Sequence, residues 1–509
     1  MKRNFAIFAF VALVGGQFGC SRFTPIGYPP SAGTPSPVAD NVSEKLILIA
    51  AGQPDKAKSD SPLFGGSPSR NMVNLIDKNV PTEWNVEEKK EKNIKWIAQL
   101  GTRSYGGPVI ANGIVLVGTN AKGMNKGEKA VLVAYSEATG KQLWKLTHDF
   151  PGLALFNEAL GEGLCSTPVV DGEHIYYVLP GCEVVCADLK GKVHWKYDMM
   201  KELKIVPFHL GNCSPVVVGD LVMVITANGR DDEGHIPSPK SPSFIAINKK
   251  TGKIVWQSNL PGDKIIEGQW SNPTVATVDG KTQVIFAGGD AVLYSFEPET
   301  GKLIWQCSCN PVRGKGKRET ENYMISTPVV VGDRLYVGMG VYPDHPQSPR
   351  SAHVVCIDIT KKGDVSPKSL DAKDPANKGS ALVWAFGGMI DPSPAKGRQA
   401  YMGPTISTPC VHDGLVYIPE LAGYLHCLDA KSGQRYWEHD FKATTWGSAY
   451  YVDGKVYVGN EDGDVVIFAH GKTKKIIATH NMDDGIHGTP VVANGVLYII
   501  TKTKLYAIK

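Results

Sequence analysis

From about residue 94 to the C-terminus, short apolar stretches alternate with polar turns in a repeating order. Most copies begin with Ser or Thr before a Pro, followed by two apolar residues and a turn that contains Gly. Most end with a sequence such as Thr-Gly-Lys and then a Trp. A period of about 50 residues with strand-type alternation and no helical periodicity predicts an all-β propeller, in which each copy forms one four-stranded blade.

Two recurring positions count the copies. The Pro position is occupied by Pro108, Pro168, Pro215, Pro273, Pro328, Pro409 and Pro490, with Ala449 in its place once. The Trp position is occupied by Trp96, Trp144, Trp195, Trp256, Trp305, Trp384 and Trp437, with Ile477 in the last copy. Each position occurs eight times, so we expect eight four-stranded antiparallel blades. Because the first Trp precedes the first Pro, we expect residues 94–100 to complete the last blade beside residues 505–508 and to cover its open edge.

A third column explains several of the ten cysteines. It holds Ala134, Cys186, Ala246, Ser295, Cys356, Cys427 and Ala507. Cys alternating with Ala and Ser predicts a tightly packed position rather than a reactive thiol. The sequence has neither a Cys-x-x-Cys-His haem motif nor the paired Cys-x-x-Cys set of a zinc site.

The N-terminus has the pattern of an export signal. Lys2 and Arg3 precede a short apolar stretch, and small residues end at Gly19-Cys20. We interpret residues 1–20 as a signal peptide, which directs the protein to the periplasm or outer membrane. A lipid on Cys20 is one interpretation, and an ordinary cleavage site nearby is the other. We expect residues 21–60 to be a flexible Pro- and Ser-rich spacer, 61–93 a lead-in segment, and 94–509 the propeller.

The charge pattern argues against nucleic-acid binding. The chain carries 54 basic and 50 acidic residues, a net charge of +4, and the two signs are mixed along it. A nucleic-acid-binding protein usually concentrates its basic residues on one face. We interpret the basic run at residues 313–318 as a solvated loop.

The repeat unit Asp429-Ala-Lys-Ser-Gly433…Trp437 and its copies resemble the PQQ-like quinoprotein propellers. Phe64-Gly65-Gly66-Ser67-Pro68-Ser69-Arg70-Asn71 also resembles the lead-in of that superfamily. The resemblance implies two branches. One contains quinone-dependent alcohol and sugar dehydrogenases. The other contains BamB-like envelope proteins, which are scaffolds in outer-membrane protein assembly and have no cofactor.

In the dehydrogenase branch, the resemblance implies PQQ against a disulfide of two adjacent Cys, a Trp below the cofactor, a Ca²⁺ ion and an Asp base. This sequence has no adjacent Cys pair, and Cys307-Ser-Cys309 comes nearest. We therefore favour a non-enzymatic scaffold or binding module with a protein partner in the envelope and no cofactor. The alternative is a divergent oxidoreductase that uses PQQ with calcium.

The residues three before each Pro position should meet at the mouth of the channel. They are Tyr105, Cys165, Asn212, Trp270, Ile325, Ile406, Trp446 and His487. Of these, Tyr105, Asn212, Trp270, Trp446 and His487 suit an aromatic ligand or a peptide. The alternative is that these side chains only fill the neck of the ring.

Three acidic segments can be interpreted as metal ligands or as ordinary loops. Residues 461–464 resemble a short calcium loop, but we expect a hairpin turn. Residues 231–235 and Asp344-His345 combine carboxylates with His, and we expect solvated insertions in the third and fifth blades. We predict no metal site, and we regard these insertions as the best candidates for partner contacts.

Overall fold

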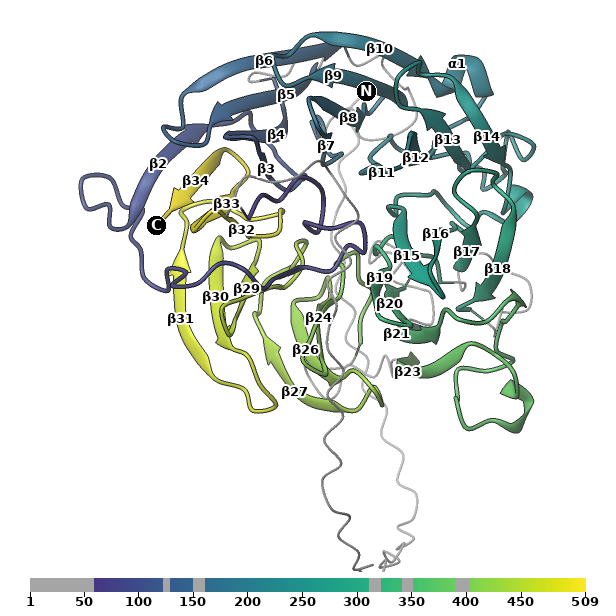
Figure 1. Cartoon of the computed structure of the whole chain (residues 1–509). Helices are drawn as coiled ribbons and strands as arrows, with labels where there is room; N and C mark the ends of the chain where they lie inside the picture. The colour runs from purple at the N-terminus through teal and green to yellow at the C-terminus, as the bar shows by residue number, and fades with distance from the viewer. Residues whose placement is uncertain (1–58, 122–128, 150–160, 311–321, 341–350, 390–401) are drawn as a thin grey trace, which may run out of the picture. The chain divides into compact units, whose positions relative to one another are not determined.

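The computed structural model describes residues 59–121, 129–149, 161–310, 322–340, 351–389 and 402–509. The expected signal peptide, Cys20, the basic run at 313–318 and Asp344-His345 lie outside these ranges. Residues 51–509 belong to one compact unit. Within its described part, eight sheets of antiparallel strands surround a central channel, as the repeat count predicts (Figure 1).

Blades are numbered in chain order, and the strands of each are given from the channel outward. Blade 1 contains β3 (Val109–Ala111), β4 (Ile114–Asn120), β5 (Lys129–Ser136) and β6 (Gln142–Asp149), and blade 2 contains β7 (Val169–Asp171), β8 (His174–Val178), β9 (Glu183–Asp188) and β10 (Val193–Asp198). Blade 3 contains β11 (Val216–Val218), β12 (Leu221–Ile225), β13 (Phe244–Asn248) and β14 (Ile254–Ser258), and blade 4 contains β15 (Thr274–Val278), β16 (Lys281–Ala287), β17 (Val292–Phe296) and β18 (Leu303–Ser308).

Blade 5 contains β19 (Val329–Val331), β20 (Arg334–Met339), β21 (Ser351–Asp358) and β23 (Leu382–Met389), and blade 6 contains β24 (Cys410–His412), β25 (Leu415–Pro419), β26 (Tyr424–Asp429) and β27 (Arg435–Asp440). Blade 7 contains β28 (Tyr450–Val452), β29 (Lys455–Gly459), β30 (Asp464–Ala469) and β31 (Ile476–Asn481), and blade 8 contains β32 (Val491–Ala493), β33 (Val496–Ile500), β34 (Lys504–Ile508) and β2 (Ile94–Gln99).

Two short strands extend blades in parallel: β1 (Val73–Asn74) pairs with β28, and β22 (Gly363–Asp364) pairs with β18. The described helices are short, namely α1 (Met199–Leu203) and the 3₁₀ turns Gly262–Lys264 and Pro375–Asn377. In the described part of the chain, none is long and apolar enough to cross a bilayer.

The ring closes as predicted. β2 pairs antiparallel with the C-terminal strand β34, with Trp96 opposite Ala507. An N-terminal strand thus completes the blade whose other three strands end the chain. Because β2 supplies the outer strand of blade 8, the edge of β34 is not left unpaired.

Six of the seven outer-strand Trp residues form a hydrogen bond to the next blade. Within its own sheet each Trp lies opposite a residue of the small column, as in the pairs Ala134 with Trp144 and Cys427 with Trp437. A larger side chain there would compete with the indole for space, which explains why Cys, Ala and Ser alternate at this position. The indole N–H of Trp144 donates to the Leu189 carbonyl in the turn of the next blade, at 2.8 Å.

Trp305 departs from this pattern and bonds within its own blade, to Gln283 Oε1 at 2.7 Å. The reason lies in the following blade, where residues 359–381 replace the usual short turn between β21 and β23. This connection contains β22, which covers the outer strand that carries Trp305.

The Ser and Thr residues before the Pro positions connect neighbouring inner strands. Ser326 Oγ donates to the Ser407 carbonyl at 2.7 Å, and Ser407 Oγ donates to the Gly447 carbonyl at 2.9 Å. The Thr408 N–H donates to Ser448 Oγ at 2.8 Å. A hydroxyl at these positions therefore bonds across the blade boundary, which explains why Ser and Thr recur there.

The lead-in, which we define as residues 59–77, bonds to every blade. Without it, the edge of each inner strand that faces the channel would have unpaired backbone N–H and C=O groups. Ser61 exchanges two backbone hydrogen bonds with Ile110, and Asn71 bonds both backbone groups of Val411 through its side-chain amide. One hydrogen-bond partner of the lead-in in each blade, from blade 1 to blade 8, is as follows: Ile110, Val170, Ser214, Val275, Val330, Val411, Tyr451 and Val492.

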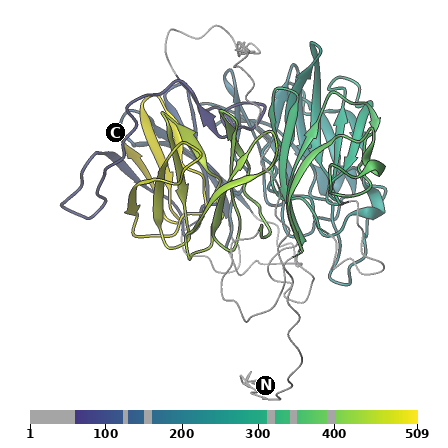
Figure 2. The same ribbon diagram turned by 90° about the horizontal axis from the view of Figure 1, so that it is seen from below.

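Arg70 is the centre of this lead-in and is fully buried. Its guanidinium donates to the carbonyls of Phe64, Ser214, Pro215 and Pro273 at 2.8–3.0 Å. These bonds tie the lead-in to blades 3 and 4. Ser59 and Asp60 are bonded too, to Asn494 and Asn112 of blades 8 and 1, so both ends of the lead-in meet near blade 8. Figure 2 shows this segment along one face of the ring.

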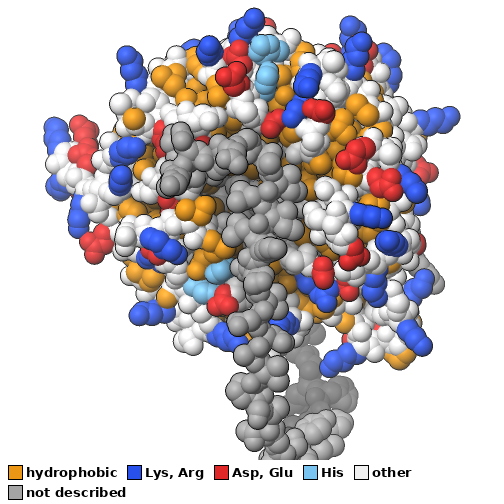
Figure 3. All heavy atoms as spheres, viewed as in Figure 1, with side chains coloured by type: hydrophobic (Ala, Val, Ile, Leu, Met, Phe, Trp, Pro, Cys, Tyr) orange, Lys and Arg blue, Asp and Glu red, His pale blue; other side chains and the backbone are white. Residues whose placement is uncertain are grey.

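On the face viewed in Figure 3, acidic and basic side chains are interspersed among apolar ones. Among the described side chains visible on that face, no continuous patch of one sign of charge is seen.

Candidate functional site

A cavity of about 830 Å³ lies at the end of the channel where the chain enters each inner strand. All eight residues three before a Pro position line this cavity: Tyr105, Cys165, Asn212, Trp270, Ile325, Ile406, Trp446 and His487. They converge because each occupies the same register before a strand that faces the channel. Phe64 also lines the cavity. The lead-in bonds to inner strands beyond the Pro positions, so Phe64 forms part of the cavity floor.

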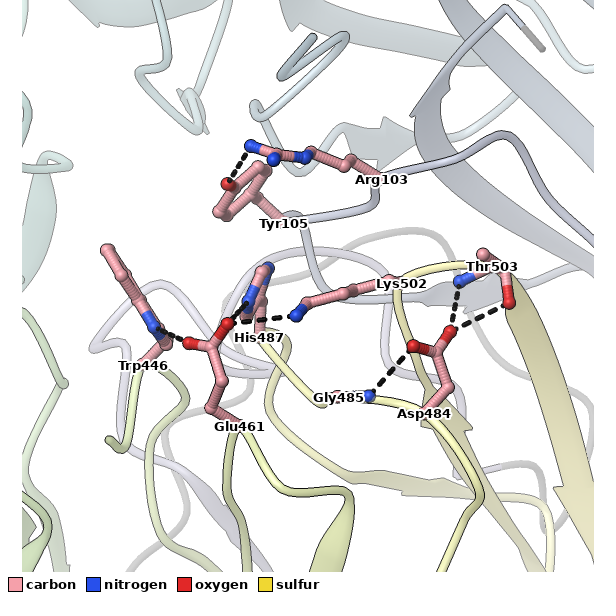
Figure 4. A network of polar contacts seen from close by, with 9 residues as sticks. All are labelled: Arg103, Tyr105, Trp446, Glu461, Asp484, Gly485, His487, Lys502 and Thr503. Atoms are coloured by element: carbon pink, nitrogen blue, oxygen red, sulfur yellow. Dashed lines mark hydrogen bonds and ion pairs between the residues drawn. The ribbon is translucent and has the colours of Figure 1, made fainter. Parts of the chain in front are cut away.

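The wall formed by blades 7, 8 and 1 contains a network around Glu461 (Figure 4). One carboxylate oxygen accepts from Lys502 Nζ at 2.9 Å and lies 3.2 Å from His487 Nε2. The other accepts from Trp446 Nε1 at 2.5 Å. Side chains from three different loops of blades 7 and 8 therefore hold one carboxylate in a fixed orientation.

The network sets the charges of this wall. Burial alone would raise the pKa of Glu461, but the hydrogen bonds from Lys502, His487 and Trp446 outweigh it and lower the pKa to about 2. Burial lowers the pKa of His487, whose side chain is 4% exposed. At neutral pH, Glu461 is therefore ionised and His487 is neutral.

Tyr105 adds an aromatic surface to the same wall. Its ring stacks on His487 with centroids 4.6 Å apart and meets Trp446 edge-on at 6.3 Å. Arg103 Nη1 donates to the Tyr105 hydroxyl at 3.4 Å. Burial raises the pKa of Tyr105 to about 12, so the hydroxyl keeps its proton.

A second aromatic cluster lies across the cavity on blades 3 to 5. The Trp270 ring lies 5.5 Å from Phe208 and 6.2 Å from Tyr323. Beside it, Arg230 pairs with Glu267 at 2.6 Å and lies over the Phe208 ring at 5.1 Å. This wall combines a flat apolar surface with an internally neutralised ion pair.

Asn212 lies between Cys165 and Trp270 in the register of the ring. Its side-chain Oδ1 is buried and accepts no hydrogen bond in the described part of the chain. A buried amide oxygen without a donor is unfavourable, so a donor group on a bound ligand would be stabilised there.

The described cysteines form no disulfide. Cys165 is the cysteine that lines the cavity, and burial raises the pKa of its thiol well above the usual value. Cys307 and Cys309 are free and buried in the core between blades 4 and 5. Nine cysteines are described, and all are free.

The two acidic segments that lie in the described ranges form turns. Residues 461–464 connect β29 to β30 as a hairpin, and Asp231 Oδ1 accepts from the His235 N–H at 2.7 Å. Among the residues that the structure describes, no three His, Cys, Asp or Glu side chains are placed to hold a metal ion together.

Sequence reasoning missed several residues of the cavity, namely Arg103, Glu162, Phe208, His209, Arg230, Glu267, Tyr323 and Lys502. Most lie in loops whose lengths differ between blades, so no fixed offset from the Pro position identifies them. Arg103 could have been predicted from the sequence, since it lies two residues before Tyr105. Glu461 was noted only as part of an acidic turn.

Curated relatives with sequence similarity include two enzymes. The chain is 24% identical over 362 residues to a polyvinylalcohol dehydrogenase of Pseudomonas sp., which covers 62% of this chain and 51% of that protein. It is 22% identical over 292 residues to a tetrathionate hydrolase of Acidithiobacillus ferrooxidans, at 50% and 53% coverage. The chain thus spans about half the length of these relatives.

A solved structure of low sequence identity shares the fold. A quinohemoprotein alcohol dehydrogenase from Pseudomonas putida HK5 superimposes with a TM-score of 0.57 and 13% identity, over 89% of this chain and 80% of that one. BamB from Moraxella catarrhalis gives a TM-score of 0.49 and 14% identity, over 81% of this chain and 97% of that one.

A family model matches almost the whole propeller, over residues 84–231, 128–438 and 421–508. Its description is outer membrane protein assembly factor BamB. The eight blades, the Trp and Pro columns and this match together show that the chain belongs to the PQQ-repeat propeller family of that description.

Proposed function

We propose that this protein is an exported binding propeller of the cell envelope, which holds a protein partner at its cavity and the surrounding loops. The observation that carries the proposal is the cavity, which has a floor, two aromatic clusters and ion pairs that are neutralised internally. Recesses with aromatic anchors and polar rims are where protein interfaces concentrate their binding energy. The description of the family supports a partner in outer-membrane assembly.

Site-specific crosslinking tests this proposal. A photoreactive amino acid at Asp232, which is exposed and lines the cavity, should capture one defined envelope protein. The matched control is Glu299, an exposed carboxylate in the turn between β17 and β18 at the opposite end of blade 4. Capture should weaken when Trp270→Ala removes the aromatic anchor. Equal capture from both positions, or none from either, contradicts the proposal.

A divergent quinoprotein oxidoreductase is the second candidate, because one of the curated relatives is a polyvinylalcohol dehydrogenase. The described residues do not fit the PQQ site that the resemblance implies. The cavity holds a single described cysteine, and no described carboxylate set is arranged for a metal ion. We therefore derive no reaction step through PQQ.

An activity assay separates the two candidates. We expect no dye reduction when the purified protein is mixed with PQQ, Ca²⁺ and polyvinyl alcohol, a primary alcohol or an aldose. Turnover that depends on PQQ and disappears in Trp446→Ala would favour the enzyme. The crosslinking result does not depend on this assay.

The proposed location rests on the N-terminal signal. We propose export to the periplasm or outer membrane, with a lipid on Cys20 as a tether and no nucleic-acid partner. Metabolic labelling with a radioactive fatty acid should label the wild-type protein but not Cys20→Ala. Label that persists in the variant contradicts the lipoprotein, and an unlabelled wild type favours an ordinary signal peptide.

A further inference from the structure

Arg103 differs from the other long cationic side chains that line the cavity. Lys502 is paired with Glu461 at 2.9 Å, and Arg230 is paired with Glu267 at 2.6 Å. In the described part of the chain, the guanidinium of Arg103 contacts no carboxylate, and its side-chain hydrogen bond goes to the Tyr105 hydroxyl. An arginine with spare planar donors on a cavity wall is suited to bind an anion.

Tyr105 completes a donor set. Its hydroxyl oxygen accepts from Arg103, so its own O–H hydrogen remains to donate to another group. Stacking on His487 holds the ring in place. The hydroxyl and the guanidinium are thus adjacent donors on a rigid support, which is the arrangement that a carboxylate accepts.

The Glu461 carboxylate does not compete for Arg103. Its two oxygens already receive hydrogen bonds from Lys502, His487 and Trp446. Figure 4 shows Arg103 beside Tyr105, with the Glu461 network on the other side of the Tyr105 and His487 rings. The charges of Lys502 and Glu461 compensate each other, so Arg103 is the uncompensated cation among the described cavity-lining residues of blades 7, 8 and 1. The Glu162 carboxylate, at the entrance to blade 2, also lines the cavity, where it lies 3.5 Å from His209 and its charge raises the pKa of Tyr105.

The cavity wall on blade 3 is acidic. Asp231 and Asp232 line it on blade 3, beside the neutral pair of Arg230 and Glu267. A negatively charged ligand group is therefore repelled from blade 3 and from Glu162, and the donors of Arg103 and Tyr105 are its favourable contact.

We propose that Arg103 and Tyr105 form a carboxylate-binding subsite. Its ligand is a carboxylate of the protein partner, either an Asp or Glu side chain or the C-terminus. The inference rests on the proposed function, since it names the group that the cavity recognises.

The test uses three short peptides as probes and the full mature chain as the receptor. Acetyl-Ala-Ala-Ala has a free C-terminus, acetyl-Ala-Asp-Ala-amide has a side-chain carboxylate, and acetyl-Ala-Ala-Ala-amide has neither. Saturation-transfer NMR at low salt should detect one or both carboxylate peptides but not the neutral amide. The comparison between the first two peptides identifies the source of the carboxylate.

Arg103→Gln should weaken binding of the carboxylate peptide at least about tenfold, because a charge-assisted pair is lost. Arg103→Lys should give an intermediate loss, since the charge remains without the planar donors. Arg334→Gln is the matched control, because Arg334 begins β20 and pairs with Asp358 outside the cavity. It should bind as the wild type does, and the melting temperatures of the variants verify folding.

Three results would overturn the subsite: equal binding of the neutral amide, no binding of any peptide, or unchanged binding by Arg103→Gln. Crosslinking at Asp232 can still capture a partner in each case. Failure of the subsite is therefore distinguishable from failure of the proposed function.

Discussion

At the scale of single residues, the Gly in the turn before an outer strand meets two requirements at once. Gly433 has a φ of +72°, and a Cβ there would lie 2.6 Å from the Trp384 ring of the preceding blade. The turn needs a left-handed backbone, and the neighbouring indole needs the space. The Trp and Gly columns of the repeat are thus two sides of one contact between blades.

This double requirement can be measured with two variants. Gly414 has the same φ of +72°, but a Cβ there would contact nothing within 4 Å. We expect Gly414→Ala to cost about 1–2 kcal/mol of unfolding free energy, from backbone strain alone. Gly433→Ala should cost at least about 1 kcal/mol more, because the methyl group displaces Trp384. Urea unfolding of both variants checks this, and equal costs would show that the indole moves aside freely.

A second prediction at this scale concerns Glu461. Its folded pKa of about 2 lies below the usual 4.5, so the ionised carboxylate stabilises the native state above pH 4.5. This contribution is lost as the pH falls through about 2. The difference in melting temperature between wild type and Glu461→Gln should therefore be largest near neutral pH and shrink between about pH 5 and 2. The same substitution at exposed Glu299 is the control, and a gap that does not change with pH contradicts the network.

At the scale of elements, the lead-in has the largest effect on how the channel is built. Isolated inner strands of three to five residues would expose backbone groups to the channel, and the lead-in satisfies one or more on every blade. Sequence reasoning predicted a lead-in segment at residues 61–93 but could not predict the bonds that residues 59–77 make. The partners of the lead-in lie up to several hundred residues away from it in the sequence, and irregular backbone contacts produce no periodic pattern in the sequence.

Arg70 tests the lead-in directly. Burial lowers its pKa to about 10, and the guanidinium still serves four carbonyls. Arg70→Met leaves these acceptors buried without donors, so we expect a loss of about 3 kcal/mol or more in unfolding free energy. Arg70→Lys should lose less, and Arg334→Gln at the surface should change little. A stability of Arg70→Met close to that of wild type would show that water replaces the guanidinium.

At the scale of the whole molecule, the features that sequence could predict are those that repeat. Eight copies of the Pro and Trp positions gave the blade number, and the order of the first Trp and Pro gave the closing strand. The same register predicted that Tyr105, Trp270 and His487 would line one cavity. Glu461 and Lys502 come from connecting loops, where each blade differs, so their meeting with His487 required three-dimensional information.

Closure by β2 and clasping by the lead-in make separate contributions, which a truncation series separates. Removing residues 1–58 should leave the melting temperature nearly unchanged, because the lead-in begins at Ser59. Removing residues 1–78 takes away the bonds to all eight blades but keeps β2, and it should lower the melting temperature by several degrees or more. Removing residues 1–100 also opens the edge of β34, and it should cause the largest loss together with aggregation. Scanning calorimetry and light scattering follow the series. If the two longer truncations melt alike, β2 adds nothing once the lead-in is gone, and the ring is held by the lead-in alone.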